Sequence, residues 1–361
     1  NLGNLEVQWR QHVMVDNTPP VTVKEVGEPK SGVDDSYVTT DTSIWLNASN
    51  DEGVRKCQVS SYLHYEIRWD SDGDGVVDTV VENVTVVDND GNDTNLTRGG
   101  ISCCINFSEE CYHELWWYSS DYLGNRENVT VQPHYVDETP SVTTREYGQP
   151  FYEGGNVSWV TTGWSGNVNH YITSDTLIYL NTTDNCSGVN KTEYYVSRWD
   201  GSAFVVVQGW TVYMGPFSFA GIGDTRECLH RIFIWSVDNA GNKEAQWVQH
   251  VMVDNTSPES GKVIGTPSYG VNGSYVTTNT SIWLNVSNDL GVHRCQVSSY
   301  LHYEVWWDSD GDGVVDTVVE DVTVVDNDGN DTNLTRGGIS CCINFSEECY
   351  HELWWYSSDY L

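Results

Sequence analysis

Short segments along the chain alternate apolar and polar residues with a period of two. This pattern appears in TSIWLNAS (42–49), DTLIYLNTT (175–183), TSIWLNVS (280–287), HELWWYSSD (113–121) and HRIFIWSVD (230–238). A period of two places alternate side chains on opposite faces of a β-strand. Turn residues separate these strands about every ten residues, and no stretch has convincing helical periodicity. The pattern predicts an all-β fold of tandem β-sandwiches.

The sequence repeats at two spacings. HVMVDNTPP at 12–20 returns as HVMVDNTSP at 250–258, a shift of 238, and residues 84–122 recur letter for letter at 322–360 with the same shift. Within that unit, residues 110–128 align with 227–245 at a shift of 117. The repeat predicts an elongated array of modules of about 120 residues. We call residues 17–137 the first module, 138–254 the second and 255–361 the third, with an isolated final strand at 1–16.

The two ends of the sequence are out of register with the modules. NLGNLEVQWRQHVMVD at 1–16 corresponds to 239–254, the turn and final strand of the second module, whereas the third module stops before such a strand. The chain is either a window on a longer covalent array or a subunit whose first strand completes the third module of a neighbour. An open sandwich exposes an unpaired edge and needs a partner. A direct join would read DYL–NLGN, longer than DYLGN, which favours the second explanation.

The charge narrows the range of partners. The chain has 52 acidic and 17 basic residues, a net charge of −35. Such a surface repels nucleic acid and anionic lipid, which bind through Lys and Arg, and attracts divalent cations. No apolar run is long enough to cross a membrane. We therefore expect neither nucleic-acid binding nor direct membrane insertion.

An acidic loop, DSDGDGVVD, occurs at 70–78 and again at 308–316. It matches the D-x-D-x-D-G start of a calcium loop, although its twelfth position is Val81 in place of the usual Glu. The flanking segments are strand-like, so the prediction is a β-loop that binds structural Ca²⁺; the alternative is a solvated acidic hairpin. A second acidic loop, 88–93, is expected to complete the ligand shell. The candidate ligands are Asp70, Asp72, Asp74, Asp78, Asp308, Asp310, Asp312 and Asp316.

Asn-x-Ser/Thr sequons exceed the number expected by chance and predict N-linked glycans. The alternative is that turns rich in Asn and Thr create sequons incidentally. The predicted sites are Asn47, Asn83, Asn92, Asn95, Asn106, Asn128, Asn156, Asn181, Asn185, Asn190, Asn272, Asn279, Asn285, Asn330, Asn333 and Asn344.

Ten cysteines recur with the modules and show no CxxC zinc spacing, which favours disulfides and an oxidising compartment. Alignment predicts Cys186–Cys228 in the second module and Cys57–Cys111 in the first, with Cys295 and Cys349 as their counterparts in the third. The adjacent cysteines leave other pairings open, including a vicinal bridge or a link to a neighbouring chain. These are Cys103, Cys104, Cys341 and Cys342.

Residues 184–244 contain D-N-C-S-G-V-x-K-T-E-Y-Y-V, then W, G-P-F-S-F and H-R-I-F-I-W-S-V-D-N-A-G-N-K-E. This segment resembles the Ig-like repeats of archaeal and bacterial cell-surface proteins and extracellular fibres. The second module matches throughout, whereas in the first an acidic insertion replaces the W…GPF segment. The resemblance implies Ig-like sandwiches in a stalk or fibre on a prokaryotic surface, archaeal above bacterial, with no catalytic residues.

No sequence signature of catalysis is present: HExxH, GxSxG and phosphate loops are absent. His113 and His230 recur in equivalent positions, which favours a structural role. Of the adjacent pairs Trp116–Trp117 and Trp354–Trp355, one ring should point outward. We predict no enzyme, but a glycosylated extracellular filament subunit that assembles head to tail with itself. The alternatives are an adhesin stalk that binds elsewhere, or accessory domains of a secreted hydrolase.

Overall fold

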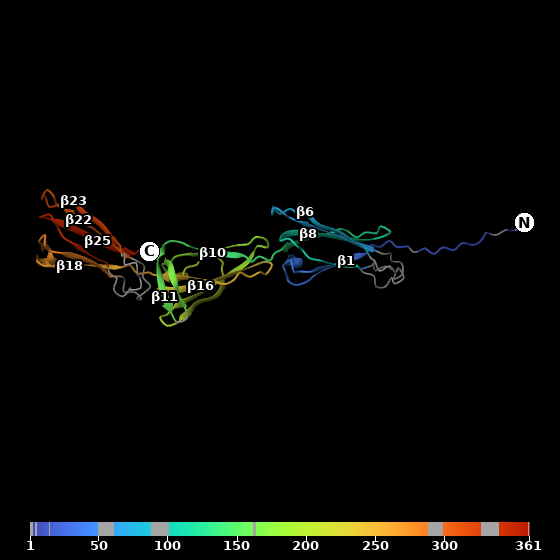
Figure 1. The fold of residues 1–361 in the computed structure, drawn as a ribbon, viewed down its shortest axis with the longest axis horizontal. Coiled ribbons are helices and arrows are strands. Elements are labelled where there is room, and N and C mark those ends of the chain that lie inside the picture. Colours follow the sequence, from blue (N-terminus) through green and yellow to red (C-terminus); the bar gives the residue numbers. More distant parts are fainter. Residues whose placement is uncertain are drawn as a thin grey trace. The chain divides into compact units, whose positions relative to one another are not determined.

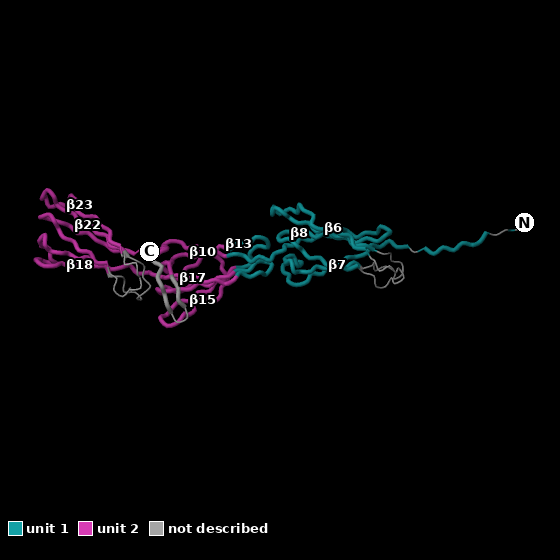
Figure 2. The backbone as a smooth tube through the Cα atoms, viewed as in Figure 1, with its two compact units in different colours: residues 1–142, 182–191, 236–244 teal, residues 143–181, 192–235, 245–361 magenta. Residues whose placement is uncertain are grey.

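A computed structural model describes residues 3, 6–13, 15–49, 61–87, 101–161, 164–287, 299–325, 339–359 and 361. It divides into two compact units, residues 1–142 with 182–191 and 236–244, and residues 143–181 with 192–235 and 245–361 (Figure 2). The elements of the described residues are β-strands and three single turns of 3-10 helix, which confirms the all-β prediction. No helix in the described part is long and apolar enough to cross a membrane.

The first module is a sandwich of two sheets (Figure 1). The three-stranded sheet has the order β1 (Val21–Val26), β4 (Ile44–Ser49), β7 (Ile101–Ile105). The six-stranded sheet has the order β2 (Lys30–Ser31), β3 (Tyr37–Val38), β9 (Thr130–Val136), β8 (Cys111–Asp121), β5 (Ser61–Trp69), β6 (Thr79–Val87), with a 3-10 turn at Val33–Asp35. Leu46 and Leu63, one from each sheet, are fully buried in the core between the sheets.

The second module repeats this plan with a longer hairpin. Its six-stranded sheet has the order β11 (Phe151–Thr161), β12 (Trp164–Ile172), β17 (Trp247–Val253), β16 (Cys228–Asp238), β14 (Val189–Trp199), β15 (Phe204–Val212). A two-stranded sheet pairs β10 (Val142–Tyr147) with β13 (Ile178–Thr183), and a 3-10 turn occupies Ala220–Ile222. The final strand β17 lies between β16, antiparallel to it, and β12, parallel to it.

The described part of the third module has counterparts of the first module's strands other than β9, and they form three separate sheets (Figure 1). One sheet has the order β18 (Glu259–Ile264), β21 (Ile282–Ser287), β24 (Ile339–Ile343). A second has the order β23 (Thr317–Val325), β22 (Ser299–Trp307), β25 (His351–Asp359). The third is a short hairpin of β19 (Ser268–Tyr269) and β20 (Tyr275–Val276), which flank a 3-10 turn at Val271–Gly273.

The short hairpin of the third module is separated from the main sheet for a specific reason. In the first module β9 pairs in parallel with β3 and antiparallel with β8, so one strand connects the short hairpin to the main sheet. In the described part of the third module, no strand lies between β20 and β25, the counterparts of β3 and β8. Among the described residues, the position that β9 and β17 fill in the other two modules therefore holds no strand in the third.

Candidate strand-binding groove and module junctions

A cavity of about 650 Å³ marks the open position of the third module. Tyr275 and Val276 of β20 line one side, His351 and Leu353 of β25 line the other, and Phe345 contributes to the lining between them. We call this cavity the strand groove. It is largely apolar, because in the other modules these positions face a buried strand.

The first module shows what such a groove holds when it is filled. Val136 and His134 of β9 are fully buried, and His134 lies 5.4 Å from the ring of Phe107 between ring centres. Val38 and Leu115, the counterparts of Val276 and Leu353, have no exposed surface there. Val276 and Leu353 are both partly exposed. The difference is the surface that a final strand would cover.

An aromatic pair at the mouth of the groove shows the same contrast. In the first module Tyr135 of β9 lies between Tyr37 and Tyr112, at centroid distances of 5.4 Å and 5.3 Å. Their counterparts in the third module are Tyr275, 70% exposed, and Tyr350, 48% exposed. Both tyrosines therefore leave exposed the ring surface that faces Tyr135 in the first module.

Residues 6–16 have the sequence of a final strand without its partners. They match 244–254 except at positions 7 and 10. Val251 and Val253 of β17 are fully buried, whereas their counterparts Val13 and Val15 are 71% and 70% exposed. In the described residues this stretch forms no strand.

The same hydrogen bond recurs in the linker that follows each copy of the final-strand sequence. The carboxylate of the linker aspartate accepts a bond from the backbone of the threonine two residues later: Asp16 from Thr18 at 3.1 Å, Asp137 from Thr139 at 3.0 Å, and Asp254 from Thr256 at 3.2 Å. Asp16 thus occupies the position at the first module that Asp137 occupies at the second.

A disulfide crosses the junction between the first and second modules. Cys111 bonds to Cys186, with Cα atoms 4.6 Å apart. The predicted pair Cys186–Cys228 is therefore wrong, and so is Cys57–Cys111. The reason is that Cys111 begins β8 opposite Val136, the last residue of β9, and so faces the next module and not its own loop.

The remaining described cysteines also differ from the predicted disulfide pairing. Cys228 is also disulfide-bonded, and its partner is not among the described cysteines. Cys349 is exposed and unpaired, which excludes the predicted Cys295–Cys349 pair; Cys57 and Cys295 lie outside the described residues. No vicinal bridge forms, because Cys103 and Cys104 are neighbours on β7 and point to opposite faces.

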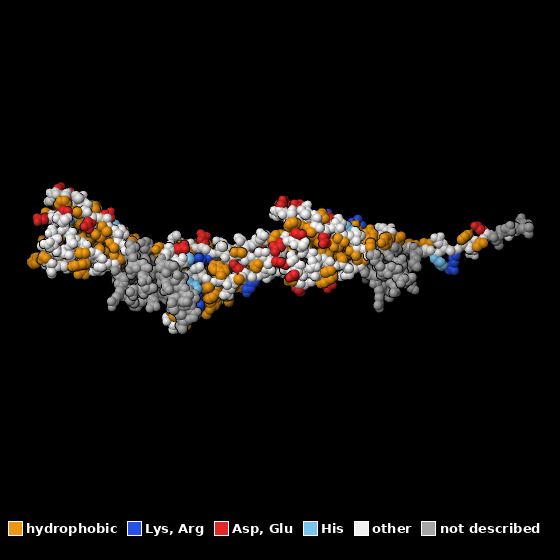
Figure 3. All heavy atoms as spheres, viewed as in Figure 1, with side chains coloured by type: hydrophobic (Ala, Val, Ile, Leu, Met, Phe, Trp, Pro, Cys, Tyr) orange, Lys and Arg blue, Asp and Glu red, His pale blue; other side chains and the backbone are white. Residues whose placement is uncertain are grey.

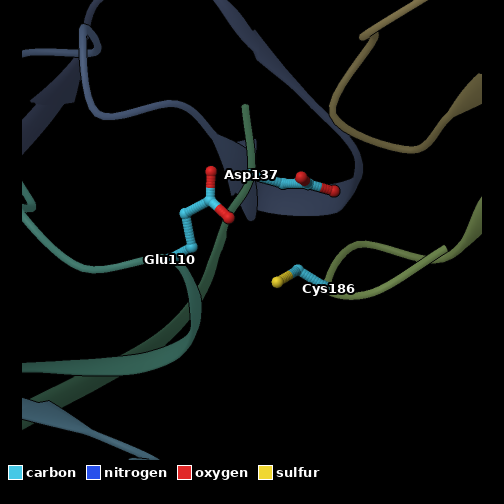
Figure 4. Close-up of side chains that lie close together, drawn as sticks. All are labelled: Glu110, Asp137 and Cys186. Carbon is cyan, nitrogen blue, oxygen red and sulfur yellow. The ribbon is translucent and has the colours of Figure 1, made fainter. Parts of the chain in front are cut away.

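Carboxylates surround the linker beside this disulfide. Glu110 and Asp137 lie next to Cys186 (Figure 4), but the sulfur of Cys186 is bonded to Cys111 and is no thiolate ligand. Asp137, Asp184 and Asp238 bring carboxylate oxygens within 4.8 Å of one another, and Asp184 Oδ2 is buried with no hydrogen-bond partner. Burial raises the pKa of Asp137. These three carboxylates could hold a cation. The only sign of them in the sequence is the recurring D-x-T-P linker, which contains Asp137 but neither Asp184 nor Asp238.

The predicted calcium loops are partly assembled. Asp70, Asp72 and Asp74 bring carboxylate oxygens within 4.8 Å of one another, as do Asp308, Asp310 and Asp312. Asp70 is buried and accepts bonds from the backbone of Gly73 at 2.9 Å and Gly75 at 2.7 Å. These three carboxylates fit a small oxygen-ligated cation such as Ca²⁺, although Asp70 also serves as the turn's own cap.

The fourth proposed ligand of each loop turns away. Asp78 accepts bonds from Ser71 at 3.1 Å and Thr79 at 3.1 Å, and the bonds from Ser71 are the main cause that lowers its pKa. Asp316 is held in the same way by Ser309 at 3.1 Å and Thr317 at 3.0 Å. The second acidic loop, 88–93, lies outside the described residues. Acidic side chains outnumber basic ones on the face drawn in Figure 3.

Most of the predicted glycan acceptors that the structure describes are exposed. Asn47 is half-buried and accepts a bond from Ser102 at 2.7 Å. The exposed ones are Asn83, Asn106, Asn128, Asn181, Asn185, Asn190, Asn272, Asn279, Asn285 and Asn344. Asn92, Asn95, Asn330 and Asn333 lie outside the described residues, as does the side chain of Asn156.

The recurrent histidines of the first two modules belong to the cores, whereas the paired tryptophans divide between the core and the surface. His113 and His230 are fully buried. His113 lies in a tilted arrangement 4.8 Å from Phe107, and His230 stacks on Phe219 at 4.3 Å, between ring centres. Trp117 is buried while Trp354 is exposed, in agreement with opposite faces for adjacent strand residues.

No protein-family model and no curated protein sequence matches this chain. Solved structures match at low similarity. The fibronectin(III)-like modules of Clostridium thermocellum CbhA are 13% identical with a TM-score of 0.26, over 64% of this chain and 94% of that one. A 1.5-MDa bacterial ice-binding adhesin is 11% identical with a TM-score of 0.29, over 95% and 98%. A tetra-tandem repeat from the extending region of a large adhesion protein is 10% identical with a TM-score of 0.27, over 94% and 75%. Similarities of this size say nothing about function.

Proposed function

We propose that the chain is a structural subunit of an extracellular filament, in which residues 6–16 of one copy fill the strand groove of another. The observation that carries this proposal is the match between the strand groove of the third module and residues 6–16, which repeat the sequence of β17 almost completely. β9 and β17 occupy the equivalent position in the two complete modules. Completion of an open sandwich by an added strand is an established mode of peptide recognition.

The complete modules fix the register of the incoming strand. Cys111 faces Val136 across β8 and β9, and Cys228 faces Val253 across β16 and β17. Transferred to the third module, Cys349 faces Val15 and His351 faces Val13. The side chains of Val13 and Val15 then enter the core, where each loses its exposed surface, a gain of roughly 1.5–3 kcal/mol for each side chain.

One difference between residues 6–16 and β17 suits the third module in particular. Arg10 stands where β17 has Val248, and the register places it beside Trp354, which is 62% exposed. In the first module, Arg68 lies 4.0 Å from the ring of Trp116, the counterpart of Trp354. The third module has Trp306 in place of Arg68. An incoming Arg10 supplies the cation that the third module lacks.

The disulfide, the sequons and the acidic loops suit an extracellular setting with glycans and structural Ca²⁺. Disulfides belong to oxidising, extracytoplasmic compartments, and exposed sequon asparagines are accessible to glycosylation. The triads at Asp70–Asp74 and Asp308–Asp312 would hold structural Ca²⁺, which would neutralise their mutual repulsion. We assign no catalysis, nucleic-acid binding or membrane insertion to the chain; its partner is a further copy of itself.

The direct test is concentration-dependent assembly of the full chain, followed by sedimentation velocity and electron microscopy. We expect linear multimers of the wild type, and their loss in the Val13→Asp, Val15→Asp double variant. Val33→Asp is the matched control, because Val33 is 82% exposed and lies outside both the strand and the groove. The double variant keeps its own groove, so its addition to the wild type should shorten the multimers.

A synthetic peptide of residues 6–16 provides the second readout. It should bind the full chain and suppress assembly, whereas a scrambled peptide of equal charge should do neither. A full chain that stays monomeric and does not bind the peptide overturns the proposal. Equal loss of assembly in the Val33→Asp control also overturns it.

A further inference from the structure

Three cysteines occupy the same position at the start of the same strand in the three modules. Cys111, Cys228 and Cys349 all have positive φ, at 80°, 102° and 94°. The next residue but one is a histidine whose Nδ1 lies near the cysteine carbonyl oxygen, at 3.1 Å, 2.9 Å and 3.2 Å. Positive φ is unfavourable for a residue with a Cβ atom, so its recurrence indicates a shared constraint.

The first two of these cysteines are bonded and the third is not. Cys111 is joined to Cys186 of the following module, and Cys228 is disulfide-bonded as well. Cys349 is exposed and unpaired, in the conformation of its bonded counterparts. Its thiol lies at the rim of the strand groove, where the register of the final strand places Val15 opposite.

We propose that Cys349 forms a disulfide with a cysteine in the first module of the next copy, and so seals each joint of the filament covalently. This inference rests on the proposed function, since the next copy is brought to Cys349 by its own residues 6–16. The junction geometry supports the placement. Asn125 donates to the carbonyl oxygen of Asp16 as Asn242 donates to that of Asp137. A strand in the groove therefore leads into the first module as β9 leads into the second.

The partner is expected from the repeat alone. Cys57 and Cys186 both follow equivalent strands of their modules, β4 and β13, although they do not align residue for residue, and Cys57 lies outside the described residues. Mass spectrometry of non-reduced peptides from the assembled chain would identify the partner cysteine. The other exposed, unpaired cysteine of the third module, Cys342 on β24, has no bonded counterpart among the described cysteines.

The chemistry is thiol oxidation. Two thiols lose two protons and two electrons, and one S–S bond forms between the copies. The electrons reduce a second disulfide, that of a dithiol oxidoreductase or oxidised glutathione, to two thiols by exchange. The Cys349 thiolate attacks that disulfide and forms a mixed disulfide with the oxidant, which releases its first thiol. The thiolate of the other copy then attacks the sulfur of Cys349 and displaces the oxidant's second thiol. The same class of oxidant suffices for Cys111–Cys186.

The test uses the full chain, assembled in a buffer of reduced and oxidised glutathione. On a non-reducing denaturing gel, the wild type should give a ladder of covalent multimers that dithiothreitol collapses to the single chain. Cys349→Ser should abolish the ladder, while sedimentation velocity still finds non-covalent multimers. Cys342→Ser is the control and should keep the ladder. Mass spectrometry of non-reduced peptides should find the Cys349 peptide linked to a peptide of the first module.

The outcomes separate this inference from the proposed function. Multimers in solution with no ladder, or a ladder that survives in Cys349→Ser, overturn the disulfide and leave strand exchange standing. An absence of multimers in solution, with or without oxidant, overturns the proposed function itself. A Cys349 peptide linked within the third module, and to no other module, also overturns the intermolecular bond.

Discussion

The side-chain amide of Asn125 donates a hydrogen bond to the backbone carbonyl oxygen of Asp16, at 3.2 Å. Asn242 makes the same bond to Asp137, at 2.9 Å. Each asparagine also bonds the aspartate that ends its own strand, Asp121 at 2.7 Å and Asp238 at 2.9 Å. One side chain thus ties the incoming linker to the module that follows it.

Replacement of Asn242 by Ala should lower the free energy of unfolding by about 1–2 kcal/mol, because it removes two side-chain hydrogen bonds beside the buried carboxylate of Asp238. Urea denaturation followed by tryptophan fluorescence measures this change. Asn190→Ala, at an exposed asparagine, is the control and should change stability by less than about 0.5 kcal/mol. Equal effects of both substitutions would show that the linker bond contributes nothing.

Removal of the Cys111–Cys186 bond should lower stability by about 2–4 kcal/mol, because the bond restricts an unfolded loop with a sequence separation of 75. The Cys111→Ser, Cys186→Ser double variant should therefore unfold at lower urea concentration than the oxidised chain. Cys104→Ser should unfold with the wild type, since Cys104 is exposed and unpaired. If reduction leaves the transition of the wild type unmoved, the bond has no stabilising role.

Acid should destabilise the first module through His134. Burial, together with the nearby charges of Lys24 and His113, lowers the pKa of His134 to about 3. The unfolded chain then binds more protons between about pH 3 and 6.5, so stability is complete above pH 6.5 and is lost as the pH falls. We expect a loss of about 2 kcal/mol from this group between pH 6.5 and 5.

His134→Val should remove that slope, because valine does not titrate and the second module has Val251 at this position. Thermal unfolding of the wild type and the variant at pH 7, 6 and 5 measures the difference. The two proteins should be similar at pH 7 and diverge at pH 5. Parallel pH profiles would contradict the assignment.

Ca²⁺ should stabilise the chain through the loops at 70–78 and 308–316. A free Ca²⁺ concentration of 100 times the dissociation constant should raise the free energy of unfolding by about 2.7 kcal/mol for each site, because only the folded state brings the carboxylates together. The Asp72→Asn, Asp310→Asn variant should lose most of the calcium-dependent rise in melting temperature. The Asp78→Asn, Asp316→Asn variant should keep it, since these carboxylates bond to Ser71 and Ser309 and not to the triad. Equal loss in both variants would restore Asp78 as a ligand.

The strand pattern and the repeat were enough to predict the fold. The segment at 61–69, for example, alternates buried and partly exposed residues as its sequence alternates apolar and polar. The repeat of 239–254 at residues 1–16 predicts a further final strand, but the described residues of that stretch form no strand. The groove residues could not be recognised in the sequence. Val276 and Leu353 have the same types as the buried Val38 and Leu115, and only the missing neighbour distinguishes them.

The disulfide pairing could not be deduced from the sequence for a related reason. When equivalent cysteines recur in every module, a bond within one module and a bond to the next give the same spacing pattern. Only the direction in which β8 presents Cys111, toward the linker at Asp137, separates the two. Likewise, the sequence placed Asp78 among the calcium ligands, whereas Ser71 and Thr79 satisfy its carboxylate.

The double pairing of β9 determines how a module would respond to a mechanical load. Its bonds to β8 and β3 run across the strand, so a pull along β9 stretches them side by side and they must fail together. A hairpin pulled open from one end would instead give way one bond at a time. A final strand held in this way would let tandem modules bear tension with little extension.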